Sequence, residues 1–286
     1  MQYLAPATLE EAVGAYAAAA GAARILAGGP DLLVQMRLGL VRPGLIVDIK
    51  KIAEVTSVEE TADGGFFIGA AVSGAALAKH PRFSKVWPGV LEALNLIGST
   101  QVQGRASLGG NLCNGSPAGD SVPALVAAGA VVTLQGPNGR RNLSVEDVPA
   151  GPGRTNLASG EIAVGFILPP RPTGSGDAYL RMIPRTEMDI AVVGCGVSLT
   201  IENGVCTAAR VGLGAVAPTV LRVDAAAEAL VGSRLDDAAL ENAAEACRAA
   251  CNPIDDKRGT IAYRTKVSGV LLKRAAGIAA ERAKEG

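Results

Sequence analysis

Glycines and small polar residues are concentrated at residues 107–120, in the stretch SLGGNLCNGSPAGD, for which we predict neither a helix nor a strand. The pair Gly109 and Gly110 carries no Cβ, so its main-chain N–H groups can approach an anion closely. The same residue types are also typical of an exposed turn. Taken alone, the stretch indicates either a binding loop for a polyanionic cofactor or a surface loop.

A second glycine pair favours the cofactor interpretation. Residues 23–26 form a short apolar run that continues into Gly28 and Gly29 and then into the helical pattern of residues 32–36. A strand, a glycine turn and a helix N-terminus together form a phosphate site, because the helix start offers free N–H groups and a positive dipole end. The motifs G-x-G-x-x-G and G-x-x-x-x-G-K-S/T do not occur there, so neither a Rossmann unit nor a P-loop is supported.

The elements around the second glycine pair predict an α/β unit. Thr8 and Glu11 belong to a capping box that opens a helix continuing to Ala20. A strand at residues 45–49 follows the helix after Gly29, which predicts two parallel strands joined by a right-handed crossover. We predict further strands at residues 66–69, 131–134 and 161–168, and helices at residues 73–80, 86–96 and 123–130.

A segment rich in proline and glycine at residues 169–176 divides the chain, because it can sustain neither a helix nor a central strand. Beyond it we predict strands at residues 177–182, 192–201 and 205–213, then helices at residues 224–231, 236–250 and 261–280. The predicted fold class is α+β, with an α/β N-terminal domain at 1–172, in subdomains 1–55 and 56–172, and an α+β C-terminal domain with an antiparallel sheet and helices at 177–286.

Composition excludes several classes of function. The 286 residues are 49% hydrophobic, which is ample core material for two domains. The formal net charge is zero and aromatic residues make up only 3%, so we predict no nucleic-acid partner. The N-terminus lacks the basic and apolar regions of a signal peptide, and no apolar run approaches the length of a membrane span. We therefore predict a soluble, cytoplasmic protein.

The chain offers few groups for chemistry of its own. None of its five cysteines forms a C-x-x-C pair, so the spacing for an iron–sulfur cluster is missing, and Cys247 and Cys251 read as buried side chains on one helix face. His80 is the only histidine, and we interpret it as a residue at a helix C-terminus. We predict no metal site and no catalytic residue, so the reactive chemistry must belong to a cofactor.

Three motifs in order carry a family resemblance. The pattern A-G-G-x-D stands at residues 27–31, S-L-G-G-N and S-P-A-G-D-S stand at residues 107–111 and 116–121, and R-x-x-x-D-x-A-x-V stands at residues 185–193. With this spacing, nearly the whole chain resembles the FAD-binding medium subunit of molybdenum hydroxylases. That family includes the flavoprotein subunits of carbon monoxide dehydrogenase and the central flavin domain of xanthine dehydrogenase. The resemblance implies that the N-terminal domain binds FAD.

The resemblance also implies the residues that bind the cofactor. The amides of the first loop would hold the pyrophosphate, the second loop would grip phosphate oxygens, and Asn111 would reach toward the flavin. Asp120 would contact the adenosine part, and Ile97, Ala163 and Arg181 would line the adenine or flavin pocket. The full implied set is Ile25, Leu26, Ala27, Gly28, Gly29, Pro30, Asp31, Ile97, Ser107, Leu108, Gly109, Gly110, Asn111, Asp120, Ala163 and Arg181.

Two residues depart from the pattern of the family. Pro30 stands where relatives usually have threonine, serine or histidine, so the first loop loses one main-chain donor and one side-chain donor. Ile190 stands where some relatives place a tyrosine close to the flavin ring. We expect a weaker phosphate grip from the first change and altered access of the electron acceptor from the second.

The function implied by the resemblance is that of an oxidoreductase subunit. In the family, a large subunit carries the molybdenum cofactor, a small subunit carries two 2Fe–2S clusters, and the medium subunit passes electrons from these clusters through FAD to an acceptor, in an assembly expected to be a heterohexamer. Two alternatives stay open from the residues. One is a self-sufficient FAD oxidase or dehydrogenase of the wider superfamily, with Cys113 as a candidate flavin tether. The other is a non-catalytic nucleotide-binding scaffold.

Overall fold

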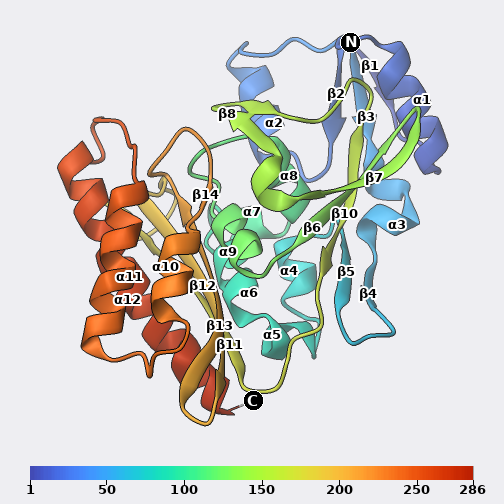
Figure 1. Ribbon diagram of the computed structural model, residues 1–286. Helices are drawn as coiled ribbons and strands as arrows, with labels where there is room; N and C mark the ends of the chain where they lie inside the picture. The colour runs from blue at the N-terminus through green and yellow to red at the C-terminus, as the bar shows by residue number, and fades with distance from the viewer. Residues whose placement is uncertain (286) are drawn as a thin grey trace.

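The computed structural model describes residues 1–285, which are arranged around three main β-sheets with helices between and beside them (Figure 1). The N-terminal sheet lies at the top of the view, the second sheet lies on the right, and the third lies at the lower left under three orange and red helices (Figure 1). Each sheet has its own cluster of buried hydrophobic side chains. The predicted class, an α/β unit followed by α+β structure, is confirmed.

The first sheet is parallel and has the strand order β1-β3-β2. Its elements are β1 (Gln2–Leu4), α1 (Leu9–Ala18), β2 (Ala23–Leu26), α2 (Pro30–Arg37), β3 (Leu45–Asp48) and the 3-10 helix η1 (Ile49–Lys51). The parallel pairing predicted for β2 and β3 is confirmed, with Ala23 opposite Leu45. The predicted cap is also present, because the Thr8 hydroxyl accepts the N–H of Glu11 at 3.2 Å.

The second sheet is antiparallel, with the order β4-β5-β10-β6-β7, and the helices between β5 and β6 cover one of its faces. Its strands are β4 (Val58–Glu60), β5 (Phe66–Gly69), β6 (Val131–Gly136), β7 (Gly139–Ser144) and β10 (Ile162–Leu168). Its helices are α3 (Ala53–Thr56), α4 (Gly74–Leu77), α5 (Phe83–Val86), α6 (Pro88–Asn95), α7 (Thr100–Gln103), α8 (Leu108–Cys113), α9 (Ser121–Ala127) and η2 (Val145–Asp147). A small hairpin, β8 (Pro149–Gly151) and β9 (Arg154–Thr155), precedes β10.

We predicted no helix at residues 107–120, and the structure shows that this prediction is wrong. Residues Leu108–Cys113 form α8, because Ser107 caps it by accepting the N–H of Gly110 at 3.2 Å. Leu108 and Leu112 are one turn apart and both are buried, which is the packing that overrides the low helix propensity of the two glycines. The predicted helix at 73–80 is also shorter than expected, since α4 ends at Leu77.

The third sheet is antiparallel, with the order β11-β12-β13-β14, and is covered on one side by the C-terminal helices. Its elements are β11 (Ser175–Met182), β12 (Val193–Glu202), β13 (Val205–Gly214), β14 (Leu221–Arg222), α10 (Asp224–Leu230), α11 (Asp237–Ala250) and α12 (Ile261–Glu285). No helix within residues 1–285 is both long enough and apolar enough to cross a membrane.

Paired glycines on the third sheet allow the second domain to approach closely. Gly196 stands opposite Gly212 in the ladder between β12 and β13, and Gly194 stands opposite Gly214. The backbone of α9 packs directly on these glycines, where no side chain projects from the sheet. A Cβ on Gly196 would lie 2.6 Å from the carbonyl oxygen of Pro123, and a Cβ on Gly212 would overlap that oxygen. The close contact between the two domains therefore requires glycine at these positions.

We expect Gly212→Ala to lower the free energy of unfolding by about 2 kcal/mol, since the new methyl group must displace α9 from a close-packed contact. Urea denaturation of the purified chain measures this. Gly277→Ala in α12 is the matched control, because a Cβ there meets nothing within 4 Å. The control should be neutral or stabilising by up to about 1 kcal/mol. Equal stability of the two variants would show that the glycine contact is unimportant.

Candidate functional site

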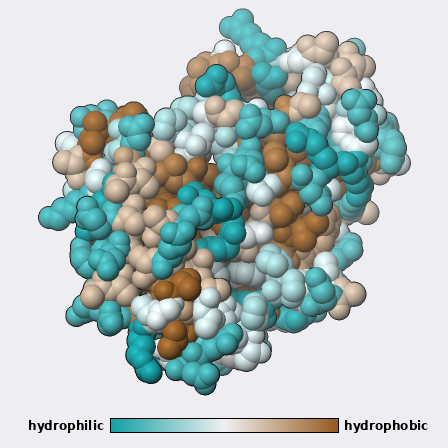
Figure 2. Space-filling model, in the orientation of Figure 1, coloured by the Kyte–Doolittle hydropathy of each residue, from teal (hydrophilic) through white to brown (hydrophobic). Residues whose placement is uncertain are grey.

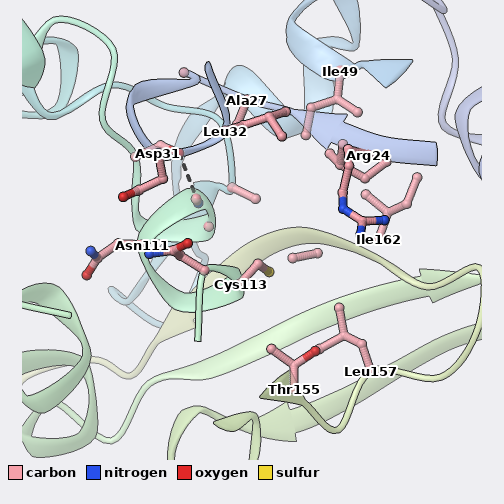
Figure 3. A pocket seen from close by; sticks show the side chains of 18 of the residues that line it. Arg24, Ala27, Asp31, Leu32, Ile49, Asn111, Cys113, Thr155, Leu157 and Ile162 are labelled. Carbon is pink, nitrogen blue, oxygen red and sulfur yellow. Dashed lines mark hydrogen bonds between the residues drawn. The ribbon is translucent and has the colours of Figure 1, made fainter. Parts of the chain in front are cut away.

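A cavity of about 560 Å³ lies where the turn between β2 and α2, the start of α8 and the chain from β9 to β10 meet. This volume is typical of small-molecule and cofactor sites. Figure 3 shows Asp31 and Asn111 on one side, Arg24 and Ile162 on the opposite side, and Thr155 with Leu157 below them. The cavity therefore has walls from elements of the first sheet, β2 and α2, and from α8 and β10 of the second sheet.

The turn between β2 and α2 presents unused main-chain donors to the cavity. Among residues 1–285, the N–H groups of Ala27, Gly28, Gly29, Asp31 and Leu32 have no protein acceptor, and all five residues line the cavity. The first N–H groups of a helix have no partner within that helix, and together with the helix dipole they favour an anion. Gly29 adopts a φ of +92°, the left-handed conformation that turns the chain from the strand into the helix.

A hydrogen-bonded network fixes the orientation of this turn. The ammonium of Lys50 donates to the Ala27 carbonyl at 2.8 Å and to Asp48 at 2.6 Å, and the Tyr3 hydroxyl donates to the other oxygen of Asp48 at 2.6 Å. Burial alone would raise the pKa of Asp48, but these hydrogen bonds hold it below its ordinary value. Sequence reasoning missed Lys50, although its place two residues after a buried strand carboxylate was a usable signal.

The two glycine turns are in direct contact. A Cβ on Gly28 would overlap the main-chain carbonyl of Arg105, two residues before the cap of α8. A Cβ on Gly109 would lie 2.6 Å from the carbonyl oxygen of Ala70, so α8 in turn packs against the segment after β5. Both glycines are therefore required for protein packing, and the packing brings the start of α2 beside the start of α8.

The second turn has fewer free donors than the sequence suggested. The N–H of Gly109 donates to the Ala70 carbonyl at 3.1 Å, and the N–H of Gly110 donates to the Ser107 hydroxyl oxygen at 3.2 Å. The oxygen of the Asn111 side chain accepts the N–H and the hydroxyl of Ser121 at 3.1 and 2.8 Å. This leaves the Asn111 amide nitrogen as the donor that this side chain can offer to a ligand.

The structure brings most of the predicted binding residues together. The predicted residues that line the cavity are Ile25, Ala27, Gly28, Gly29, Pro30, Asp31, Ile97, Ser107, Gly109, Gly110, Asn111 and Ala163. Leu26, Leu108, Asp120 and Arg181 are not among the lining residues. The segment from Gly153 to Ile162 forms a wall that sequence reasoning missed, because most of it is loop and it contains no binding motif.

Asp120 and Arg181 form a buried link to the third sheet. One oxygen of Asp120 accepts the Tyr179 hydroxyl at 3.0 Å and the other accepts an N–H of Arg181 at 2.8 Å. Burial raises the pKa of Asp120 to about 6, although Arg181 and Tyr179 oppose the rise. The next residue, Ser121, holds Asn111, so β11 is connected to the cavity wall through two adjacent residues. The contact of Asp120 with adenosine stays a prediction.

Cys113 lines the cavity and its side chain is exposed there, although the protein packed around the thiol raises its pKa to about 11. A thiol with a raised pKa is a poor nucleophile, which does not favour a covalent flavin link. His80 accepts the N–H of Phe83 and contacts the edge of the Phe66 ring, so it caps α5 instead of ending a longer helix. Within residues 1–285, no group of three or more potential ligands is placed to hold a metal ion.

These features define the class of site. Five residues whose N–H groups have no protein acceptor line this cavity together with apolar residues such as Ile97 and Ile162, and this combination fits the diphosphate and the rings of a dinucleotide. The chain is thus a dinucleotide-binding protein with neither a Rossmann nor a P-loop motif in this turn.

Comparison with known proteins gives the family. Residues 1–171 match the family described as the FAD binding domain in molybdopterin dehydrogenase, and residues 178–279 match the CO dehydrogenase flavoprotein C-terminal domain. The chain therefore belongs to the FAD-binding subunits of the molybdopterin dehydrogenases, as the sequence motifs predicted.

Individual relatives cover between 88% and 99% of the chain. The carbon monoxide dehydrogenase medium chain of Afipia carboxidovorans is 35% identical, over 99% of this chain and 97% of the relative. The putative xanthine dehydrogenase FAD-binding subunit of Escherichia coli is 30% identical, over 88% of this chain and 87% of the relative. The solved structure of reconstituted CO dehydrogenase from Oligotropha carboxidovorans has a TM-score of 0.95 at 33% identity, covering 99% of this chain and 98% of that one.

We expect Gly28→Ala to abolish retention of FAD, because the methyl group forces the two turns apart and moves the donors of α2. The ratio of flavin absorbance to protein after purification measures this. Gly14→Ala in α1 meets nothing within 4 Å and serves as the control that keeps wild-type flavin content. A Gly28→Ala protein with full flavin would contradict the role of the contact.

Asp120 should make stability depend on pH in an unusual direction. Its pKa lies near 6 in the folded chain against an ordinary value of 3.8, so the native state binds the proton more tightly. The free energy of unfolding contributed by this group therefore falls as pH rises from about 4 to about 6. Relative to Asp120→Asn, the wild-type chain should lose about 3 kcal/mol across this window.

Urea denaturation of both proteins at a series of pH values measures the difference. Burial also raises the pKa of Asp177 to about 6, but this group is common to both proteins and cancels. A stability difference that stays constant between pH 4 and 6 would show that the Asp120 carboxyl is not perturbed.

Proposed function

We propose that this chain is the FAD-carrying electron-transfer subunit of a multi-subunit molybdenum hydroxylase or dehydrogenase. In this function, electrons pass from the iron–sulfur clusters of a partner through FAD to a further acceptor. The observation that carries the proposal is the group of five N–H donors without a protein acceptor, on residues of the turn between β2 and α2 that line the cavity. Family membership supplies the chemical class of the reaction.

The residues of this chain bind and orient the cofactor. The N–H groups of Ala27, Gly28 and Gly29, with those of Asp31 and Leu32, would hold the diphosphate, and the Asn111 amide would donate to the flavin part. Pro30 supplies no donor, but as the first residue of α2 its fixed φ preorganises the helix that presents the others. Bound FAD would supply reversible acceptance and release of electrons, for which the side chains offer no substitute.

We extend the proposal to the assembly, the domains and the compartment. The partners are a large subunit with the molybdenum cofactor and a small subunit with two 2Fe–2S clusters, in a heterohexamer. The FAD-binding domain comprises 1–172 and the C-terminal domain 177–286. A cytoplasmic location is supported by five cysteines that are all free, as is usual in a reducing compartment.

Purification of the intact complex tests the proposal. We expect flavin in stoichiometric amount with this chain, and bleaching of the flavin when the enzyme's reducing substrate is added. Heat denaturation should release all the yellow colour from the polypeptide, and Cys113→Ala should retain flavin, because the thiol is not a tether. A flavin-free complex, or flavin that is not reduced by the partner's clusters, would refute electron transfer. Colour that stays with the denatured chain would favour the self-sufficient oxidase considered from the sequence.

A further inference from the structure

Helix α2 is only loosely held by the rest of the protein. None of its residues is buried, and none belongs to the three clusters of hydrophobic side chains that form the cores of the sheets. Figure 2 shows hydrophobic side chains on the surface at the upper edge of the molecule, where Figure 1 places α2. A helix of two turns is marginal in water unless tertiary contacts stabilise it. The position of α2 therefore depends on a small number of specific interactions.

One side-chain hydrogen bond links α2 to a distant part of the chain. The amide nitrogen of Gln35 donates to the side-chain oxygen of Asn114 at 3.1 Å, although the two residues are 79 positions apart. Asn114 is the residue at which α8 ends, and both residues line the cofactor cavity. Within residues 1–285, no other side chain of α2 forms a hydrogen bond or an ion pair. This bond is therefore the one polar tie between the body of α2 and the opposite wall.

The two ends of α2 are built differently from its middle. Its start is fixed, because Gly28 packs on the Arg105 carbonyl and Lys50 binds the Ala27 carbonyl. Gly29 and Gly39, which flank the helix, have φ angles of +92° and +71°. These are conformations in which the chain changes direction, and hinges lie at a few positions of this kind at the ends of elements. The helix is thus anchored before Gly29 and tied again only at Gln35.

We propose that α2 is a movable wall of the FAD cavity and that the hydrogen bond between Gln35 and Asn114 is the latch that holds it closed. Asp31, Leu32 and Gln35 line the cavity, so a rotation of α2 about Gly29 opens one of its walls. This movement governs the entry and release of FAD. Gln35 is then a positioning residue, which acts on the cofactor through Asn114 and α8. The inference requires only that FAD bind in this cavity and is independent of where its electrons come from.

The rates of FAD binding and release test the latch. Gln35→Met removes the amide but keeps the length and the helix propensity of the side chain. Loss of one hydrogen bond destabilises the closed position relative to the open one, so we expect release and binding each to be faster by about fivefold. Release is measured by exchange of bound FAD for radiolabelled FAD in the full-length chain. Binding is measured by stopped-flow flavin fluorescence with the flavin-free chain.

Three further variants separate the latch from other effects. Arg37→Met is the matched control on the same helix, because Arg37 is exposed and does not line the cavity, and it should keep the wild-type rates. Asn114→Ala should accelerate both rates as Gln35→Met does, and the combination of the two should add little to either. Gln35→Asn with Asn114→Gln exchanges the two amides at the same total length, so it should restore slow binding and release.

Amide hydrogen exchange of residues 30–37 in the flavin-free chain gives a readout that does not involve the cofactor. It should be faster in Gln35→Met than in the wild type and unchanged in Arg37→Met. Wild-type rates of FAD release in Gln35→Met would overturn the latch. Faster release with an unchanged rate of binding would also overturn it, because that result describes a direct contact with bound FAD and not a gate. A wild-type chain that binds no FAD would instead refute the proposed function.

Discussion

The close contact between Gly28 and the Arg105 carbonyl is the constraint on which the cofactor cavity depends. It joins the turn that begins α2 to the segment that leads into α8, so two short helices start side by side although they are far apart in sequence. With a side chain at residue 28, the main chains could not approach this closely, and the turn that carries the five free donors would have to shift. The Lys50 ammonium holds the same turn by donating to the Ala27 carbonyl, and Asp48 in turn accepts a hydrogen bond from Lys50.

The C-terminal domain supports this cavity without lining it. The glycines of β12 and β13 receive α9 through backbone contacts, and α9 begins directly after Asp120, which Tyr179 and Arg181 hold in place. Ser121 then fixes the oxygen of Asn111 and leaves its nitrogen for a ligand. The third sheet therefore determines the orientation of a side chain in the cavity, and a change in the domain contact should reach the cofactor through Asn111.

Two features of helix α2 lower its own stability. Its N-terminus must leave N–H groups unpaired to bind an anion, and its outer residues are exposed, so little of the helix is stabilised by its own chain. Binding of an anionic group of the cofactor would satisfy the unpaired N–H groups and so stabilise the start of the helix.

The sequence by itself determined the family and the cofactor class, because the order and spacing of its motifs resemble those of known relatives. It also predicted the parallel pair β2 and β3 and the cap at Thr8, which depend on local backbone geometry, but it missed short elements such as β1, β4 and β14. Most of the binding residues that the resemblance implied do line the cavity, although they are the smaller part of its lining. Only the tertiary structure decided that residues Leu108–Cys113 are helical, because burial of Leu108 and Leu112 outweighs the glycines between them. Only the tertiary structure showed that the N–H groups of the second turn donate to Ala70 and Ser107 within the protein, and that Asp120 is paired with Arg181. These outcomes depend on contacts between residues distant in sequence, which no local pattern encodes.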